Sequence, residues 1–591
     1  MDISTEKIYL ADQRGLTETS MIRRYSTFNF DQYYNKHKEP FGDLFICNDE
    51  FLAREPLDAL TDDSYWSNEK NVRTFAWGFY PNYFAAYGSG FTFGRYFTGQ
   101  PLNDDFAPLS PTPFTKNVHA TSTTWTFTWV RKANLFLERI QTVPMEQEAI
   151  DHWTGIARFF RAMEYHELVR TYGDIAWYDK ALLETDVAGL YKPRQPRTEV
   201  MDKVLEDFKF AAAHVRADDG EKGLTVNKSV VLAFMSRVFL FEGTYLKYHN
   251  IDQARAKTYL EAAKWAAEEV VKSGRYTVSE NYRSLFTSLS LAGSKEMILY
   301  RKYETGQLTH SLNSYNNKEP QSGASKDAID SYLAKDGLPI KLSPAYLGDK
   351  SIKNVMSDRD PRITSTFVDV LRVSKYAANA SSSGYATWKF LNEETKELPE
   401  GSGSLNQTDG PVIRYGEVLL NLAEAAAELG AITQTDLDQS INLLRARPGI
   451  ALPPLQVLGG LPAVNGKNYD DPDRDPSVQS MLWEIRRERR VELMMEGFRL
   501  NDLTRWKKME YTDTKTNPNI NRGAWIKKAD FPNTDAIIDG GGAEGYILPA
   551  SKPESQRLFE SPKVYLTPIP LDQIKLYQDA GSELKQNPGW E

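Results

Sequence analysis

Long segments with helical hydrophobic periodicity constrain the fold of this chain more than any other feature of its sequence. In residues 228–246, which follow the favourable N-cap Asn227, apolar side chains recur every three or four positions along one face. Residues 252–272 follow after a short turn, and the alanines of their apolar face allow a neighbouring helix to approach closely. The two segments therefore predict an antiparallel helix pair of the tetratricopeptide type.

Other segments extend this helical scaffold. Residues 145–171 have one apolar face that ends at Gly173, residues 412–429 and 435–446 predict a second helix pair, and residues 477–509 predict one long helix. Between them lie long segments rich in Gly, Pro and polar residues, at 88–118, 377–410, 451–476 and 530–562. Long ordered loops often carry function. The sequence predicts a mostly α-helical fold with helix pairs as scaffold, a loop-rich ligand face and little β-structure.

Composition and charge exclude several classes of protein. A net charge of −9 over 591 residues gives no electrostatic reason to bind nucleic acid. The single cysteine, Cys47, forms no intrachain disulfide and builds no cysteine-rich zinc site. No apolar run approaches the roughly 20 residues of a transmembrane helix, and residues 1–46 lack the basic start and apolar stretch of a signal peptide. We expect no cofactor and find no motif for a metal site; bound Ca²⁺ stays open, since the loops are acidic but contain no DxDxDG calcium-loop pattern.

The motifs of common enzymes are absent or fail in context. The glycines of "GGGAEG" at 540–545 fit a dinucleotide-binding pattern, but "YILPASKP" follows and does not open a helix. The chain has neither a phosphate-binding GxxxxGK[ST] loop nor a GxSxG nucleophile turn. Carboxylates are plentiful, so a glycosidase-like pair stays open at this point, because sequence does not give the separation of two carboxylates.

An Arg- and Glu-rich segment, "EIRRERRVELMMEGFRLNDLTRW" at 484–506, has another explanation than nucleic-acid binding. Its glutamates at 484, 488, 492 and 496 recur at the i, i+4 spacing of a helix, beside Arg487, Arg490 and Arg499. Charges at this spacing form ion pairs on a helix surface. We therefore expect a structural helix with surface ion pairs and an apolar stripe.

Several segments in the same order resemble the SusD/RagB family, the substrate-binding outer-membrane lipoproteins of Bacteroidetes nutrient uptake. They are "RRERRVELMMEGFRLNDLTRW", "VVLAFMSRVFLFEGTYLKY", "FRAMEYHELVRTYGDIAWY", "SDRDPRITSTF", "VIRYGEVLLNLAEAAAELG" and "YLTPIPLDQIKL…QNPGW". "CNDEFLAREPLD" at 47–58 resembles the segment that follows the lipidated cysteine of such proteins. The resemblance covers about residues 47–591.

The resemblance implies a fold, a location and a function. It implies four tetratricopeptide-like helix pairs in a single unit, residues 47–591, with an N-terminal helical half (47–280) and a C-terminal half with long loops (281–591). It implies a non-catalytic, surface-exposed protein of the outer membrane that captures oligosaccharide or polysaccharide and passes it to a SusC-like TonB-dependent transporter. It also implies lipidation of Cys47, whereas the atypical N-terminal segment 1–46 predicts none.

An acidic, aromatic loop is the first candidate for sugar binding. Aromatic rings suit the C–H faces of a sugar, and Asp, Asn and Arg suit its hydroxyls. The segment "FTFGRYFTGQPLNDDF" supplies Arg95, Tyr96, Asn103, Asp104 and Asp105. As an alternative, adjacent aspartates in a loop form turns or helix caps.

Four further aromatics complete the candidate site. Trp125 is expected at the start of a helix, at its loop-facing end, where family members often place a stacking ring. Tyr315 lies in the polar segment "HSLNSYNNKEPQSG", and Tyr385 and Trp388 lie in "SSSGYATWKF", where small flexible neighbours favour exposure. The alternative interpretation of Trp125 is a core side chain.

Three other functions stay open on the sequence alone. A peptide ligand on the same scaffold, a glycoside hydrolase and a general helical-repeat adaptor are all compatible with the helices and loops. Which glycan is bound is not encoded in any motif that we recognise.

Overall fold

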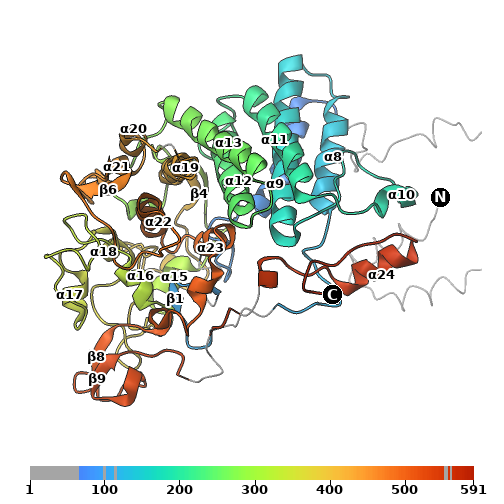
Figure 1. Ribbon diagram of the computed structural model, residues 1–591. Helices are drawn as coiled ribbons and strands as arrows, with labels where there is room; N and C mark the ends of the chain where they lie inside the picture. The colour runs from blue at the N-terminus through green and yellow to red at the C-terminus, as the bar shows by residue number, and fades with distance from the viewer. Residues whose placement is uncertain (1–64, 97–101, 112–115, 431, 552–556, 560–561) are drawn as a thin grey trace, which may run out of the picture. The chain divides into compact units, whose positions relative to one another are not determined.

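Helices are the main regular secondary structure of the described residues (Figure 1). The structure is a computed structural model that describes residues 65–96, 102–111, 116–430, 432–551, 557–559 and 562–591, and Trp66–Glu591 form one compact unit. The helices are α6 Glu69–Trp77, α7 Tyr80–Tyr83, α8 Thr128–Ile140, α9 Gln147–Tyr172, α10 Val187–Leu190, α11 Arg197–His214, α12 Lys228–Tyr248, α13 Gln253–Lys272, α14 Ser284–Thr287, α15 Leu312–Asn317, α16 Lys326–Asp330, α17 Ile352–Met356, α18 Arg362–Thr366, α19 Tyr415–Glu428, α20 Gln434–Asp438, α21 Ile441–Arg445, α22 Ser480–Glu492, α23 Arg499–Arg505 and α24 Leu571–Asp579.

The strands are short and form small antiparallel sheets. They are β1 Phe106–Ala107, β2 Met297–Arg301, β3 Gly323–Ala324, β4 Gly410–Arg414, β5 Gln456–Leu458, β6 Leu461–Val464, β7 Lys467–Asn468, β8 Trp525–Lys527 and β9 Glu544–Tyr546. The pairs are β1 with β3, β2 with β4, β5 with β6, β6 with β7, and β8 with β9. The 3₁₀ helices are η2 Pro399–Gly401, η3 Met509–Thr512, η4 Pro518–Asn521, η5 Asp539–Gly541 and η7 Pro562–Tyr565. The mostly α-helical fold class is confirmed.

The predicted helix pair at 228–272 is confirmed as α12 and α13, which pack against each other. Asn227 caps α12 by accepting a hydrogen bond from the Val230 amide at 3.1 Å. Gly243 of α12 allows close approach, because a Cβ at this position would lie 2.8 Å from Leu260 of α13. By length and composition α12 is apolar enough to cross a membrane, yet 94% of that window is buried inside the protein, as expected of a core helix.

The helix predicted at 145–171 is α9, which packs against α8 and α11. It ends at Gly173, whose φ of +76° lies in the left-handed region that glycine adopts readily. Between α9 and α11, Arg161 makes a bidentate ion pair with Asp207, with both N–O distances at 2.8 Å. Such a buried pair fixes the register of the two helices, since both carboxylate oxygens are engaged.

Two expectations about the C-terminal half are wrong in their boundaries. The segment 412–429 begins as strand β4, which pairs with β2, and only then continues as α19. Its expected partner at 435–446 is two short helices, α20 and α21. The long helix expected at 477–509 is divided into α22 and α23, because Met495 and Gly497 have φ values of +66° and +79° between them.

The surface position expected for the glutamates of α22 is also wrong. Glu484, Glu488, Glu492 and Glu496 are all buried, and Glu492 is fully inaccessible. Their partners come mostly from distant segments rather than from the same helix. We call the following set the ion network: Glu296, Arg362, Arg414, Arg447, Glu488, Glu492 and Glu496.

Glu492 is the centre of this ion network. Its carboxylate accepts hydrogen bonds from three guanidinium groups, at 2.9 Å from Arg362, 2.8 Å from Arg414 and 3.0 Å from Arg447. Burial alone would raise the pKa of Glu492, but the three cations outweigh it and lower that pKa to about 2. The ion network therefore joins α22 to β4, α18 and the segment after α21.

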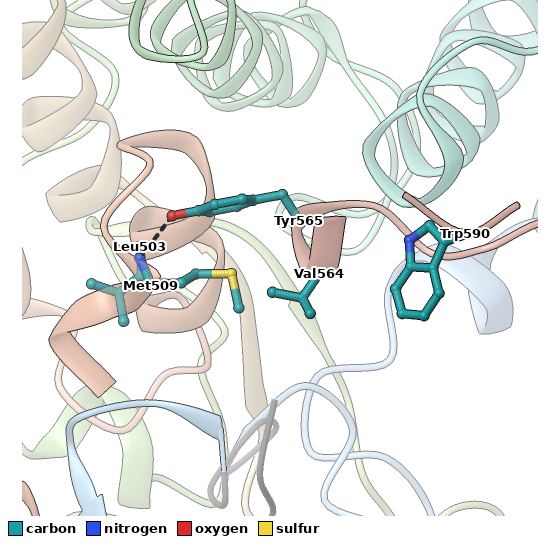
Figure 2. Close-up of a cluster of buried hydrophobic side chains, with 5 residues drawn as sticks. All are labelled: Leu503, Met509, Val564, Tyr565 and Trp590. Carbon is teal, nitrogen blue, oxygen red and sulfur yellow. Dashed lines mark hydrogen bonds between the residues drawn. The ribbon is translucent and has the colours of Figure 1, made fainter. Parts of the chain in front are cut away.

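The C-terminal end packs back onto α23. Figure 2 shows Tyr565 and Val564 beside Met509 and Leu503, with Trp590 at the other end of the same cluster. The Met509 amide donates a hydrogen bond to the Tyr565 hydroxyl oxygen at 3.1 Å. Tyr511 of η3 packs against this cluster and also lines the cavity described below, so the cluster supports one wall of that cavity.

Candidate functional site

A tightly built loop presents an aromatic ring to solvent. Gly88, Gly90 and Gly94 all have positive φ, and a Cβ on Gly94 would lie 2.1 Å from the Ala86 carbonyl oxygen. The Gly90 amide donates to the Thr309 carbonyl oxygen at 3.0 Å, which ties the loop to the start of α15. Phe91, between these fixed points, is 75% exposed.

The neighbouring ring of Phe93 meets Tyr315 of α15, with ring centroids 4.8 Å apart and planes inclined by 49°. We call Phe91, Phe93 and Tyr315 the aromatic surface. Helix α15 is held by His310, whose Nδ1 accepts a hydrogen bond from the Leu312 amide at 3.1 Å. The other ring nitrogen, Nε2, lies 3.0 Å from the Thr408 carbonyl oxygen and donates to it. Burial lowers the pKa of His310 to about 3.

A cavity of about 610 Å³ lies among α16, α22, α23, η3 and β9. We call it the charged cavity. Four aromatic side chains line it, Trp483, Trp506, Tyr511 and Tyr546. Its charged lining comprises seven cations, Lys326, Lys341, Arg486, Arg487, Arg490, Arg499 and Arg522, and seven anions, Asp104, Asp327, Asp330, Asp349, Asp471, Asp473 and Asp475. The formal charge of the lining is therefore zero.

Most charges of the cavity are paired within its lining, whereas Arg486, Arg522 and Asp475 pair with residues outside it, Glu428, Asp539 and Lys508. Arg499 holds Asp104 by two hydrogen bonds, at 2.7 and 2.6 Å, and Arg490 approaches the same carboxylate at 3.4 Å. Burial alone would raise the pKa of Asp104, but these two guanidinium groups outweigh it and hold the pKa well below its usual range. Burial raises the pKa of the neighbouring Asp105 despite its ion pair with Arg490. Among the described residues no group of three His, Cys, Asp or Glu side chains is placed to hold a metal ion.

The predicted residues Asn103, Asp104 and Asp105 lie together, but they are buried rather than displayed. Their exposed fractions are 3%, 1% and 4%, so the expected exposure of this acidic loop is wrong. The Asn103 side chain accepts a hydrogen bond from the Asp105 amide at 2.9 Å, in agreement with the alternative interpretation as a turn. Asp104 alone of the three lines the charged cavity.

Arg95 and Tyr96 attach the end of the aromatic loop to strand β4. Arg95 donates to the Val412 carbonyl oxygen at 2.7 Å and stacks on Phe498, with 4.7 Å from its Cζ to the ring centroid. Tyr96 is 1% exposed and donates to the Pro411 carbonyl oxygen at 3.0 Å. Both contacts join the loop to β4.

The other predicted aromatics, Trp125, Tyr385 and Trp388, are buried or half-buried. Trp125 precedes α8 instead of starting it, and its ring is buried edge-to-face against Tyr172 at 4.8 Å, as the core interpretation expects. Tyr385 is 2% exposed, so its expected exposure is wrong. Trp388 is half-buried, and its ring centroid lies 3.9 Å from Cζ of Arg283. Its Nε1 donates a hydrogen bond to the Thr364 carbonyl oxygen at 2.8 Å. A ligand role for these residues stays a prediction.

Sequence reasoning missed two residues of the aromatic surface, Phe91 and Phe93. Their signal was present, since two phenylalanines two positions apart stand among glycines without helical or strand periodicity around them. Tyr315 was predicted as a ligand residue; its ring contacts that of Phe93, and its role in binding stays a prediction. Cys47 and the segment 1–46 lie outside the described residues.

Comparisons with known proteins agree with this architecture. A model of the SusD family matches residues 295–590, half of the chain, and a second family model, described as starch-binding associating with outer membrane, matches residues 114–240. A SusD-like protein of Formosa agariphila is 24% identical over 501 residues, covering 79% of this chain and 89% of its own length.

Solved structures of this family share the fold. A SusD-like carbohydrate-binding protein of Bacteroides fragilis is 22% identical, with a TM-score of 0.64 over 88% of this chain and 99% of its own. A laminarin-binding SusD-like protein is 17% identical, with a TM-score of 0.55 over 88% of this chain and 100% of its own. Because the SusD family model matches half of the chain, this protein belongs to the SusD family.

Proposed function

We propose that this protein binds glycan at the cell surface without cleaving it and delivers it to a SusC-like TonB-dependent transporter of the outer membrane. The observation that carries the proposal is the aromatic surface, on which Phe91 is 75% exposed above a loop that is otherwise rigidly held. Family membership supports a carbohydrate ligand, since one matching model is described as starch-binding. The names of two related structures, one carbohydrate-binding and one laminarin-binding, support it further.

The chemistry of the aromatic surface suits a polysaccharide chain. A pyranose ring presents a patch of C–H bonds, and an exposed ring stacks on that patch while hydroxyls point outward to polar groups. Exposed Ser89 and Thr92 flank Phe91 in the loop, and Lys318 and Glu319 follow α15. An open surface of this kind accommodates a chain that continues in both directions, whereas an enclosed pocket accommodates an end.

The expected affinity is weak. Two stacking contacts at about 1 kcal/mol each and about four hydrogen bonds at roughly 0.5–1.5 kcal/mol, less the cost of ordering the chain, give about −4 to −6 kcal/mol. This corresponds to dissociation constants from about millimolar to tens of micromolar. Weak binding suits handover, because the ligand must leave the binding protein to enter the transporter.

Affinity gel electrophoresis with a panel of polysaccharides tests the binding. Phe91→Ala should lose about 1 kcal/mol of binding, about fivefold in affinity, without a change in melting temperature. Trp265→Ala is the matched control, because Trp265 is another exposed aromatic, 42% accessible, on helix α13. Equal retention of both variants and of the wild type on every retaining gel would contradict the proposed surface.

Two further experiments test the rest of the proposal. Co-purification of the protein with a TonB-dependent transporter from outer membranes is the expected result for the delivery role. For the non-catalytic role, prolonged incubation with the retained polysaccharide should release no shorter product on chromatography. Release of sugar at enzyme-like rates would overturn the binding-only function.

A further inference from the structure

The charged cavity is distinct from the aromatic surface in both its residues and its chemistry. None of Phe91, Phe93 and Tyr315 lines it. Its volume of about 610 Å³ lies within the range of roughly 300–1,000 Å³ of sites that enclose small ligands. At its rim, Lys341 and Asp473 form an ion pair at 2.5 Å and are 58% and 52% exposed, so the cavity opens to solvent there.

Three aromatic side chains of the cavity are held in the same way, each by an aspartate that also lines it. Trp483 Nε1 donates to Asp471 at 2.9 Å, the Tyr511 hydroxyl donates to Asp475 at 2.5 Å, and the Tyr546 hydroxyl donates to Asp349 at 2.6 Å. The rings come from α22, η3 and β9, three separate segments. Each polar atom is fixed by a carboxylate, so the half-buried rings are oriented before any ligand arrives.

The electrostatics of the cavity select the class of ligand. Because its seven cations and seven anions balance, a charged ligand gains nothing from net charge and must displace a pair that is already built. A sugar hydroxyl does not have to displace an ion pair. It donates a further hydrogen bond to a carboxylate that still accepts from its existing cationic or hydroxyl partner. For example, Lys326 and Tyr546 both reach the same oxygen, Oδ2, of Asp349.

We infer that the charged cavity is a second binding site, which encloses the end of a neutral saccharide about one or two rings long. Carboxylates and arginines would bind the hydroxyls, and the fixed rings of Trp483, Tyr511 and Tyr546 would pack against its C–H faces. The inference rests on the proposed glycan-binding function and deepens it, because the aromatic surface holds the chain and the cavity recognises its end.

Isothermal titration calorimetry with neutral disaccharides tests the inference. The probes are maltose, cellobiose, laminaribiose, gentiobiose, mannobiose and xylobiose, with glucuronate and glucosamine as charged comparisons. Ile340→Trp fills the cavity from a half-buried lining position that makes no ion pair. Leu342→Trp is the matched control, since Leu342 lies two residues further, is 39% exposed and does not line the cavity.

At least one neutral disaccharide should bind the wild type. Ile340→Trp should lower the affinity for that disaccharide by about tenfold or more, about 1.4 kcal/mol. Leu342→Trp should leave this affinity unchanged, and Phe91→Ala should weaken retention of polysaccharide on gels. If Ile340→Trp is unstable, Tyr546→Phe serves instead, because it removes only the hydroxyl bound to Asp349. We expect Tyr546→Phe to lower the affinity for the disaccharide by about threefold or more.

The outcomes separate this inference from the proposed function. Polysaccharide retention without disaccharide binding, or disaccharide binding that Ile340→Trp leaves intact, would overturn the cavity site alone. Tighter binding of glucuronate or glucosamine than of every neutral disaccharide would overturn the assigned ligand class. Cavity-dependent disaccharide binding without retention on any polysaccharide gel would support the cavity site and overturn the proposed function of the aromatic surface.

Discussion

Protonation of His310 should destabilise the segment that carries Tyr315. The imidazole is fully buried and neutral, with Nε2 donating to the Thr408 carbonyl oxygen and Nδ1 accepting from the Leu312 amide. A second proton has to be placed on Nδ1, where it faces the Leu312 N–H, so the charged form loses a hydrogen bond and is buried without a counter-ion. His310→Gln removes the titration and keeps a donor for Thr408.

The size of the effect follows from the two pKa values. His310 has a pKa of about 3 in the folded protein, against about 6.5 in an unfolded chain. The unfolded state binds the proton more tightly, so this stabilisation is fully present above pH 6.5 and is lost as the pH falls toward 3. Between about pH 7 and about pH 5 the loss assigned to His310 is about 2 kcal/mol.

Urea unfolding followed by tryptophan fluorescence at about pH 7 and about pH 5 measures this difference. The wild type should lose about 2 kcal/mol more between the two pH values than His310→Gln does. His119→Gln is the matched control, since His119 is exposed and its replacement should leave the pH dependence as in the wild type. A difference between wild type and His310→Gln below about 0.5 kcal/mol would refute the reasoning.

Three further predictions concern the scaffold and the loop. Glu492→Gln leaves three buried arginines short of a charge and should lower the free energy of unfolding by about 3–5 kcal/mol in urea; a loss under about 1 kcal/mol would contradict the ion network. Gly94→Ala places a Cβ against the Ala86 carbonyl oxygen, so polysaccharide retention should fall severalfold, and unchanged retention would show that loop shape is unimportant. Asp104→Asn weakens the pair with Arg499 and should lower the melting temperature; unchanged melting together with lost retention would instead favour direct ligand contact.

The helical scaffold could be predicted because its signals are local. The apolar faces of α9, α12 and α13 repeat with the helical period, and Asn227 and Gly173 mark their ends. The break between α22 and α23 was not predicted, because Met495 has a positive φ that no residue preference indicates for methionine. Burial of the α22 glutamates was missed because their partners at 362, 414 and 447 are far away in sequence.

The site was only partly predictable for the same reason. Asp104 resembles a loop carboxylate until Arg499, 395 positions later, is known to hold it. Trp125 and Tyr385 are buried by segments that no local pattern connects to them. Tyr315 was selected because no apolar periodicity surrounds it; its ring is half-buried against Phe93, and its role in binding stays a prediction.

The break after α22 decides which residues the arginines of this segment contact. In one unbroken helix, side chains nine positions apart, such as Arg490 and Arg499, lie about half a turn away from each other around the axis and about 13.5 Å apart along it. The left-handed residues Met495 and Gly497 redirect the chain, so the guanidinium groups of Arg490 and Arg499 both contact Asp104. Asp104 belongs to the N-terminal half of the chain, so straightening the turn between α22 and α23 should release the segment around Asp104 from both helices.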